Sequence, residues 1–182
     1  MFFAIFAVFV LTNAAAQAAE AAVAELNFTF TRQSGHSSNQ FAVWIEDVQG
    51  VHVKTLYATR YTANGGYKRR PSSIPQWVKQ SRLADMTKTQ VDAISAATPK
   101  TGNLTYSWDG TDSRGAALPA GNYIIRIEGT LRGENQVYYR APIQIEQTGG
   151  LRPGAAEVSV EYVGSAGAER SMIGNVTVRV LR

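Results

Sequence analysis

The sequence predicts an all-β protein, a β-sandwich with a short two-helix insert. Stretches of alternating apolar and polar residues recur along the chain, and glycine-rich turns separate them. About eight short strands connected in this way are typical of an antiparallel sandwich. Only residues 72–98 interrupt the alternation with signals that favour helices. The length of 182 residues suits a single domain that buries a core of its own.

The strands can be placed from the alternation and from the turn residues. Leu26, Phe28 and Phe30 alternate with polar residues, and Gln49-Gly50 predicts the turn of a hairpin. Strands are expected at residues 26–30, 41–45, 51–55, 104–108, 123–127, 137–145, 158–162 and 176–180. The side chains expected to face the core are Phe28, Val43, Ile45, Trp108, Tyr123, Ile125, Ile127, Val158, Val160, Val176 and Val178.

The helical insert is predicted from its capping signals. Residues 73–76 and residues 87–90 each have the pattern Ser/Thr-x-x-Gln, which is a capping box at the start of a helix. Apolar residues follow each box, and Pro99 disfavours continuing the second helix through the residue before it. An insert of this kind in an all-β chain is where we expect residues with a purpose beyond the scaffold.

Residues 1–18 have the composition of a secretory signal peptide. They hold 15 apolar residues and no charge, and the apolar run at 2–11 is about half as long as a membrane span. Cleavage is expected after Ala18, or as late as residue 24, and residues 25–182 are expected to form the single sandwich domain. An exported domain without cysteine suits a bacterial periplasm. We therefore expect a periplasmic protein with no transmembrane segment in its mature chain.

The composition excludes several classes of function. Without cysteine, the chain cannot form disulfides or thiolate metal sites, and two histidines are too few for a histidine-rich metal centre. The net charge of +4 is small and scattered, which argues against a nucleic acid partner. Glu46 and Asp47 are expected to point to opposite faces of a strand rather than form a catalytic pair. We predict no catalytic residue, and a hydrolase is only a distant alternative because no Gly-x-Ser-x-Gly elbow is present.

One segment carries a recognisable turn pattern. Trp108-Asp-Gly-Thr-Asp-Ser-Arg-Gly115, followed by Leu118-Pro-Ala-Gly-Asn-Tyr123, resembles the immunoglobulin-like repeat of flagellar hook-capping proteins. The resemblance implies an immunoglobulin-like sandwich. Asp109 and Asp112 are expected to hydrogen-bond backbone amides in these turns. They lack the further acids of a calcium loop, so turn formation is favoured over metal binding.

A second resemblance spans nearly the whole mature chain. Residues 41–47, 53–56, 65–71 and 91–99 together resemble a bacterial periplasmic family of unknown function. Genes of that family tend to stand beside genes for flavin transferases and for haem or flavin membrane reductases. The resemblance implies an association with extracytoplasmic redox systems and a periplasmic or inner-membrane redox partner. It implies no established activity.

The stretch from Asp92 to Thr98 resembles the acceptor motif of periplasmic FMN transferases, Asp-x-x-Ser/Thr-Gly-Ala-Thr. Asp92, Ser95, Ala97 and Thr98 match the motif, while Ala96 stands where glycine is usual and lacks the freedom to adopt positive φ. The resemblance implies covalent attachment of FMN to the hydroxyl of Thr98. The residues themselves favour a plainer alternative, a helix whose small side chains pack closely on the sandwich.

A basic cluster formed by Lys68, Arg69 and Arg70 precedes that motif, with Tyr67 beside it and Tyr61 nearby in the sequence. Clustered cations with aromatic rings can bind an anionic group such as a flavin phosphate or a haem propionate. A solvated loop is the plainer alternative.

The patterns favour a non-catalytic accessory or ligand-binding module in the periplasm, with no cofactor expected. The alternative is a covalent FMN-carrying electron-transfer protein modified at Thr98, with Asp92 and Ser95 as parts of the acceptor motif. The ligand, the partner and the oligomeric state stay open.

Overall fold

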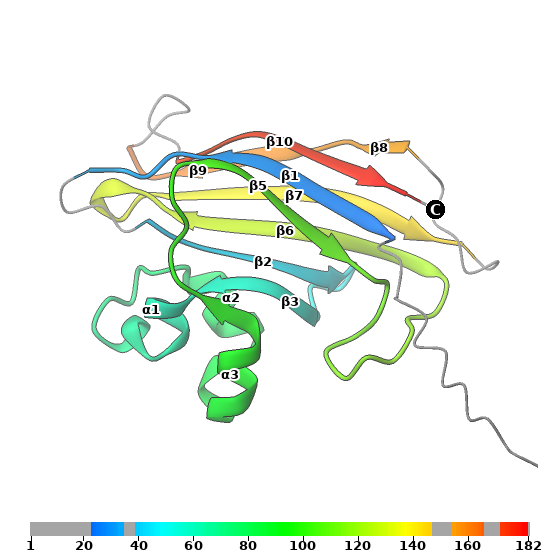
Figure 1. Cartoon of the computed structure of the whole chain (residues 1–182), viewed down its shortest axis with the longest axis horizontal. Coiled ribbons are helices and arrows are strands. Elements are labelled where there is room, and N and C mark those ends of the chain that lie inside the picture. Colours follow the sequence, from blue (N-terminus) through cyan, green and yellow to red (C-terminus); the bar gives the residue numbers. More distant parts are fainter. Residues whose placement is uncertain (1–22, 35–38, 147–153, 166–171, 182) are drawn as a thin grey trace, which may run out of the picture.

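Two β-sheets and a layer of short helices make up the structure, a computed structural model that describes residues 23–34, 39–146, 154–165 and 172–181 (Figure 1). The strands are β1 (Ala24–Phe30), β2 (Gln40–Asp47), β3 (His52–Thr59), β4 (Ser95–Ala96), β5 (Gly102–Trp108), β6 (Gly121–Thr130), β7 (Gln136–Ile145), β8 (Gly154–Ala156), β9 (Ser159–Val163) and β10 (Ile173–Val180). The helices are α1 (Arg60–Ala63), α2 (Pro75–Gln80) and α3 (Lys88–Ile94), with the 3-10 helices η1 (Gly66–Lys68), η2 (Leu83–Asp85) and η3 (Arg132–Glu134). The predicted signal peptide at 1–18 lies outside the described residues.

The two sheets pack face to face. One has the strand order β5-β1-β10-β8 and the other β4-β3-β2-β6-β7-β9. Neighbouring strands pair antiparallel, except that β4 runs parallel to β3. The core between the sheets is rich in aromatic rings, and Phe41 contacts Phe28, Phe30 and Tyr57 with ring centroids 5.6, 5.2 and 4.8 Å apart. This arrangement confirms the predicted all-β sandwich.

Strand β2 is buried on both faces, which explains its continuous apolar sequence. Phe41, Val43 and Ile45 belong to the sandwich core, while Ala42 and Trp44 belong to a second core beneath the helices. The helical layer contributes Ile74, Trp77, Leu83 and Val91 to that second core. The helices therefore form a third layer against the sheet that contains β2 (Figure 1).

Buried hydrogen bonds from β6 attach this layer to the sandwich. Glu128 is fully buried, and its carboxylate accepts the backbone N–H groups of Gln76 at 3.1 Å and Trp77 at 2.7 Å. The hydroxyl of Thr130 accepts the backbone N–H of Ile74 at 2.7 Å. These are the N–H groups that the first turn of a helix leaves without intrahelical partners. The start of α2 is thus capped by the sheet beneath it.

The insert differs from its predicted bounds and from one predicted cap. Helical structure begins at Arg60, immediately after β3, so the insert starts before the predicted range of 72–98. The capping box predicted at 73–76 does not form, because α2 begins at Pro75 and β6 supplies its caps. The capping box predicted at 87–90 is confirmed at the start of α3.

Most residues predicted to face the core are buried, but the C-terminal strands differ. Val160 is predicted to face inward and is instead 49% exposed, because β9 is the edge strand of its sheet. Val158 and Val176 are only partly buried at the margin of the core. Alternation within a strand separates its two faces, but it does not show whether another layer covers either face.

Candidate functional site: a cationic pocket beside Thr98

Helix α1, helix η1 and the segment after β4 enclose a pocket of about 720 Å³. We call it the cationic pocket, and its lining includes Arg60, Lys68, Arg69, Tyr61 and Thr98. Small-molecule sites commonly have volumes of about 300–1,000 Å³, so the size is suitable for a ligand. The pocket brings together Thr98 and the basic loop, which the sequence singles out separately.

The charges that line the cationic pocket are all positive. Among the residues that the structure describes, no acidic side chain lines it. Within the same ranges, Arg60, Lys68 and Arg69 form no ion pair, and Lys68 Nζ lies 6.0 Å from the ring centroid of Tyr67. Uncompensated positive charge in a concave site attracts anions.

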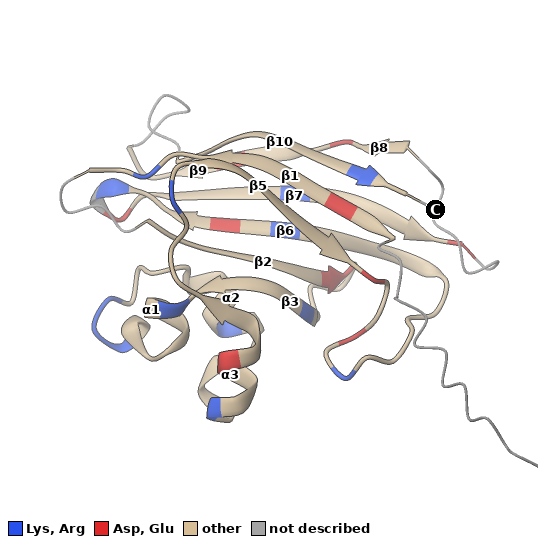
Figure 2. Cartoon of the chain, viewed as in Figure 1, with Lys and Arg blue, Asp and Glu red and all other residues tan. Residues whose placement is uncertain are grey.

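The positive charge of the chain is concentrated on the helical insert (Figure 2). Residues 60–100 carry eight lysines or arginines and two acids, whereas the rest of the chain carries ten against twelve. The two acids, Asp85 and Asp92, are engaged in ion pairs with cations of the same segment. The insert is therefore a basic layer on a slightly acidic sandwich.

Two glycines shape the loop that carries Lys68 and Arg69. Gly65 has a φ of +95°, a left-handed conformation that strains residues with a side chain. Gly66 packs so closely on Tyr61 that a Cβ atom would lie 2.4 Å from its carbonyl oxygen. Backbone hydrogen bonds from Lys68 N to Gly65 O (3.1 Å) and from Arg69 N to Gly66 O (3.0 Å) close the turn. The loop backbone thereby fixes where the two cations emerge.

Replacing Gly66 with alanine is expected to lower the free energy of unfolding by about 2 kcal/mol, because the added methyl group collides with Tyr61. Urea denaturation measures the change. Gly174→Ala is the control, since nothing lies within 4 Å of a Cβ atom at that position. Equal stability of the two variants would show that the loop is not packed as described.

The stretch that resembles the FMN-acceptor motif is helical only in its first three residues, which end α3 at Ile94, and extended from Ser95 onward, where the sequence favours a continued helix. Its middle residues form β4, and the Tyr57 hydroxyl donates a hydrogen bond to the Ala97 carbonyl oxygen at 3.0 Å. Burial raises the pKa of Tyr57 to about 12, which keeps this donor protonated. Ala96 is exposed and extended, so the position does not need glycine's freedom to adopt positive φ. Thr98 is partly exposed and lies beyond the last turn of α3, where the helix dipole has little effect.

The predicted site residues divide into two groups. Those that line the cationic pocket are Lys68, Arg69 and Thr98. Arg70 does not line it. Asp92 lies on the exposed surface of α3 in an ion pair, and Ser95 is buried with a hydroxyl that has no hydrogen-bond partner among the described residues. Neither of these two motif residues lines the pocket beside Thr98.

Arg60 is a site residue that sequence reasoning missed, whereas Tyr61 is expected near the basic cluster and does line the pocket. Arg60 follows β3 directly and belongs to no motif. The parallel register that pairs Thr59 with Ala96 carries Arg60 out of the sheet next to Ala97. This pairing joins distant parts of the chain, so no local signal in the sequence identifies Arg60.

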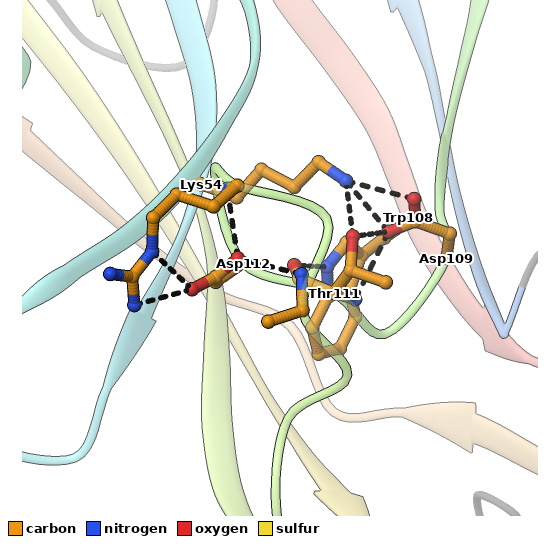
Figure 3. Close-up of polar contacts among 7 residues, drawn as sticks. Lys54, Trp108, Asp109, Thr111 and Asp112 are labelled. Atoms are coloured by element: carbon orange, nitrogen blue, oxygen red, sulfur yellow. Dashed lines mark hydrogen bonds and ion pairs between the residues drawn. The ribbon is translucent and has the colours of Figure 1, made fainter.

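Asp109 and Asp112 hold the turn after β5, as the sequence predicts (Figure 3). Asp109 accepts the Thr111 N–H at 3.0 Å and contacts Lys54 Nζ at 2.8 Å, while Trp108 Nε1 donates to Thr111 O at 3.0 Å. Asp112 accepts two backbone N–H groups of its own turn. Burial alone would raise the pKa of Asp109, but the hydrogen bonds from Lys54 and Thr111 lower it to about 2. Both carboxylate oxygens of Asp109 contact the Lys54 ammonium at 2.8 Å, so this carboxylate is already paired with a cation.

Replacing Lys54 with methionine is expected to raise the pKa of Asp109 toward its ordinary value, because the carboxylate loses its cation. The free energy of unfolding should fall by about 1 kcal/mol. An NMR titration follows the carboxyl group, and urea denaturation gives the stability. Arg114→Met is the matched control, since that arginine is 86% exposed and its pair with Asp112 is worth little. An unchanged Asp109 pKa would contradict the described network.

Other candidate sites have little support. In the described ranges, no group of three or more histidine, aspartate or glutamate side chains could hold a metal ion. Burial lowers the pKa of His52 to about 4, so its imidazole is neutral near pH 7. Glu46 is buried, accepts a hydrogen bond from Trp44 Nε1 at 3.3 Å and pairs with Arg126. No helix among the described residues is long and apolar enough to span a membrane.

Comparison with known protein families finds one family that matches most of the chain. The profile of a family described as "Predicted periplasmic protein (DUF2271)" matches residues 21–161. The chain belongs to the DUF2271 family. Membership confirms the predicted resemblance to a periplasmic family of unknown function, and it assigns the protein to the periplasm. The match covers the helical insert and every residue of the cationic pocket.

Searches of curated proteins and of solved structures find no match. The immunoglobulin-like assignment of the sandwich therefore stays a prediction, and no relative of known activity supplies a function for the DUF2271 chain.

Proposed function

We propose that this protein is a non-catalytic periplasmic module that binds a small anionic ligand in the cationic pocket. The observation that carries the proposal is the charge of the pocket, which is lined by Arg60, Lys68 and Arg69 and, among the described residues, by no acid. Guanidinium groups bind phosphate or carboxylate through paired N–H donors, and the ammonium adds a point charge. Among the described residues, neither imidazole nor carboxylate lines the pocket, and we assign Lys68 and Tyr61 to binding the ligand.

Tyr61 narrows the class of ligand. Its side chain lines the cationic pocket and is 46% exposed, which makes it available for stacking. A planar ring system that carries a phosphate or carboxylate would use both the ring and the cations. FMN and haem belong to this class, and either agrees with the redox association that the family resemblance implies.

Isothermal titration calorimetry with FMN and with riboflavin tests the proposal, because the two flavins differ only in the phosphate. FMN is expected to bind at least about tenfold more tightly, and this advantage should shrink as salt screens the cations. Equal affinities for the two flavins, or no saturable binding of FMN, would contradict the proposal.

A second candidate function is covalent carriage of FMN for electron transfer. The observation in its favour is that Thr98 lines the same pocket as Lys68 and Arg69, so a phosphate bonded to its hydroxyl would lie among cations. The transferase would take the FMN phosphoryl group from a flavin dinucleotide, so that the pyrophosphate bond breaks and the nucleoside monophosphate leaves with the hydroxyl proton. The acceptor motif usually has glycine where this chain has Ala96. Because Ala96 is exposed and its backbone is extended, alanine fits this position without backbone strain.

Intact mass spectrometry after co-expression with a periplasmic FMN transferase tests this second function. The wild type should gain the mass of an FMN group, and Thr98→Ala should not. Thr101→Ala is the control, because it removes a nearby exposed hydroxyl outside the pocket lining. An unchanged mass for the wild type, or equal labelling of Thr98→Ala, would overturn it.

A further inference from the structure

A second pocket, of about 600 Å³, lies where the helical insert meets the sandwich. We call it the insert crevice. Strand β3, the segment from η2 to α3 and the turn after β5 contribute its walls. Lys54, whose contacts with that turn are drawn in Figure 3, stands in one wall. The crevice shares no lining residue with the cationic pocket.

The charges in the insert crevice are neutralised, unlike those of the cationic pocket. Each lysine or arginine of its lining contacts a carboxylate. The ion pairs are Lys54–Asp109, Arg82–Asp85 and Arg114–Asp112, with N–O distances of 2.8, 2.8 and 3.2 Å. A crevice with paired charges offers an anion no uncompensated partner, and it does not select for a charged ligand.

His52 adds no charge and no free base to the insert crevice. Its Nε2 lies 2.8 Å from Thr55 Oγ1, which also accepts the Trp77 indole N–H at 3.0 Å. Burial lowers the pKa of His52 to about 4, so the ring is neutral at the pH of the compartment. The imidazole is therefore a fixed wall of the crevice rather than a reactive group.

Ser81 is the polar group that the fold leaves unsatisfied in the insert crevice. Its side chain is buried, 6% exposed, and its hydroxyl has no hydrogen-bond partner among the described residues. A buried hydroxyl without a partner costs about 1–3 kcal/mol. Ser81 lines the crevice, but its hydroxyl oxygen exposes less than 1 Å² of surface. The side chain therefore has to rotate about χ1 before a hydrogen-bonding atom of a ligand can become the partner of this hydroxyl.

The remaining wall of the insert crevice combines an apolar patch with the polar side chains of Gln90, Ser107 and Ser113. Leu56 packs on the sandwich core, and Met86 and Ile94 pack on the core beneath the helices. Ligand sites typically combine such an apolar surface with a few placed polar groups.

We propose that the insert crevice binds a neutral amphipathic small molecule whose polar atom hydrogen-bonds to Ser81 Oγ. The apolar body of the ligand lies against Leu56 and Ile94, and the paired charges form the rim. This site is independent of the proposed anion site, so either can fail without the other.

Two matched fluorescent probes test the proposal. N-phenylnaphthylamine is neutral, and anilinonaphthalene sulfonate is the same ring system with a sulfonate group. Titrations use the full chain in which Lys68→Ala and Arg69→Ala remove two cations of the other pocket. The neutral probe should bind saturably and at least about tenfold more tightly than the sulfonate. No saturable binding, or equal affinity for the two probes, would overturn the proposal.

Variants then locate the binding site. Ala93→Trp places an indole in the insert crevice and should weaken binding of the neutral probe by at least about tenfold. Lys88→Trp adds the same group to α3 at a position that is 86% exposed and should leave binding unchanged. Ser81→Ala should weaken binding about fivefold. Wild-type affinity in either Ala93→Trp or Ser81→Ala would overturn the proposal, and circular dichroism confirms that each variant is folded.

Discussion

Replacing Glu128 with alanine is expected to lower the free energy of unfolding by about 4 kcal/mol. The buried carboxyl group of Glu128 accepts the first N–H groups of α2, from Gln76 and Trp77, and alanine leaves both without a partner. Urea denaturation measures the loss. Glu157→Ala removes an exposed carboxylate and should change stability by less than about 0.5 kcal/mol. A loss below about 1 kcal/mol for Glu128→Ala would contradict its role as the cap of α2.

The same residue predicts how stability depends on pH. Burial raises the pKa of Glu128 from 4.5 to about 7, although the N–H groups of Trp77 and Gln76 oppose the shift. Between these values the folded protein keeps the proton that the unfolded chain releases. The free energy of unfolding should therefore fall as pH rises from about 4.5 to 7, by up to about 3 kcal/mol, and then level off. Glu128→Gln cannot ionise and should flatten this part of the profile.

Reversing two charges of the cationic pocket is expected to produce the largest effect on binding. With Lys68→Glu and Arg69→Glu, the three cations of the lining become one cation and two carboxylates. FMN affinity should fall by at least about 100-fold, because the phosphate then meets like charges.

The matched control makes the same change in net charge outside the pocket. Arg70 and Lys79 belong to the insert but do not line the pocket, so Arg70→Glu with Lys79→Glu should cost less than about fivefold. Equal losses in the two double variants would mean that only the net charge of the insert attracts FMN and that the pocket does not bind it.

The parts of the fold that were predictable from sequence are those that local patterns determine. Alternation placed the strands, and the capping box at Thr87 placed α3, because its partners lie within one turn. The capping box predicted at Ser73 does not form, because Glu128, which is far away in the sequence, caps α2 instead. The prediction that Val160 is buried is wrong, because alternation cannot show that β9 lies at the edge of its sheet.

The candidate site likewise contains residues that the sequence reveals and a residue that only the fold reveals. Lys68, Arg69 and Thr98 carry chemistry that residue types and a motif reveal, and the structure places them around one pocket. Arg60 joins them only through the parallel pairing of β3 with β4, which connects distant parts of the chain. The charge of the pocket was likewise hidden, because the net charge of +4 averages a basic insert with a slightly acidic sandwich.

Amide NMR during a titration with FMN tests the central claim, that the cationic pocket is the anion-binding site, most directly. The largest chemical-shift changes should fall in two separate segments, residues 60–69 and 97–98, which only the folded chain brings together. Titration with riboflavin under the same conditions should leave the amides of Lys68 and Arg69 nearly unchanged, because it lacks the phosphate. Shifts centred on the sandwich, or equal shifts with both flavins, would contradict the claim.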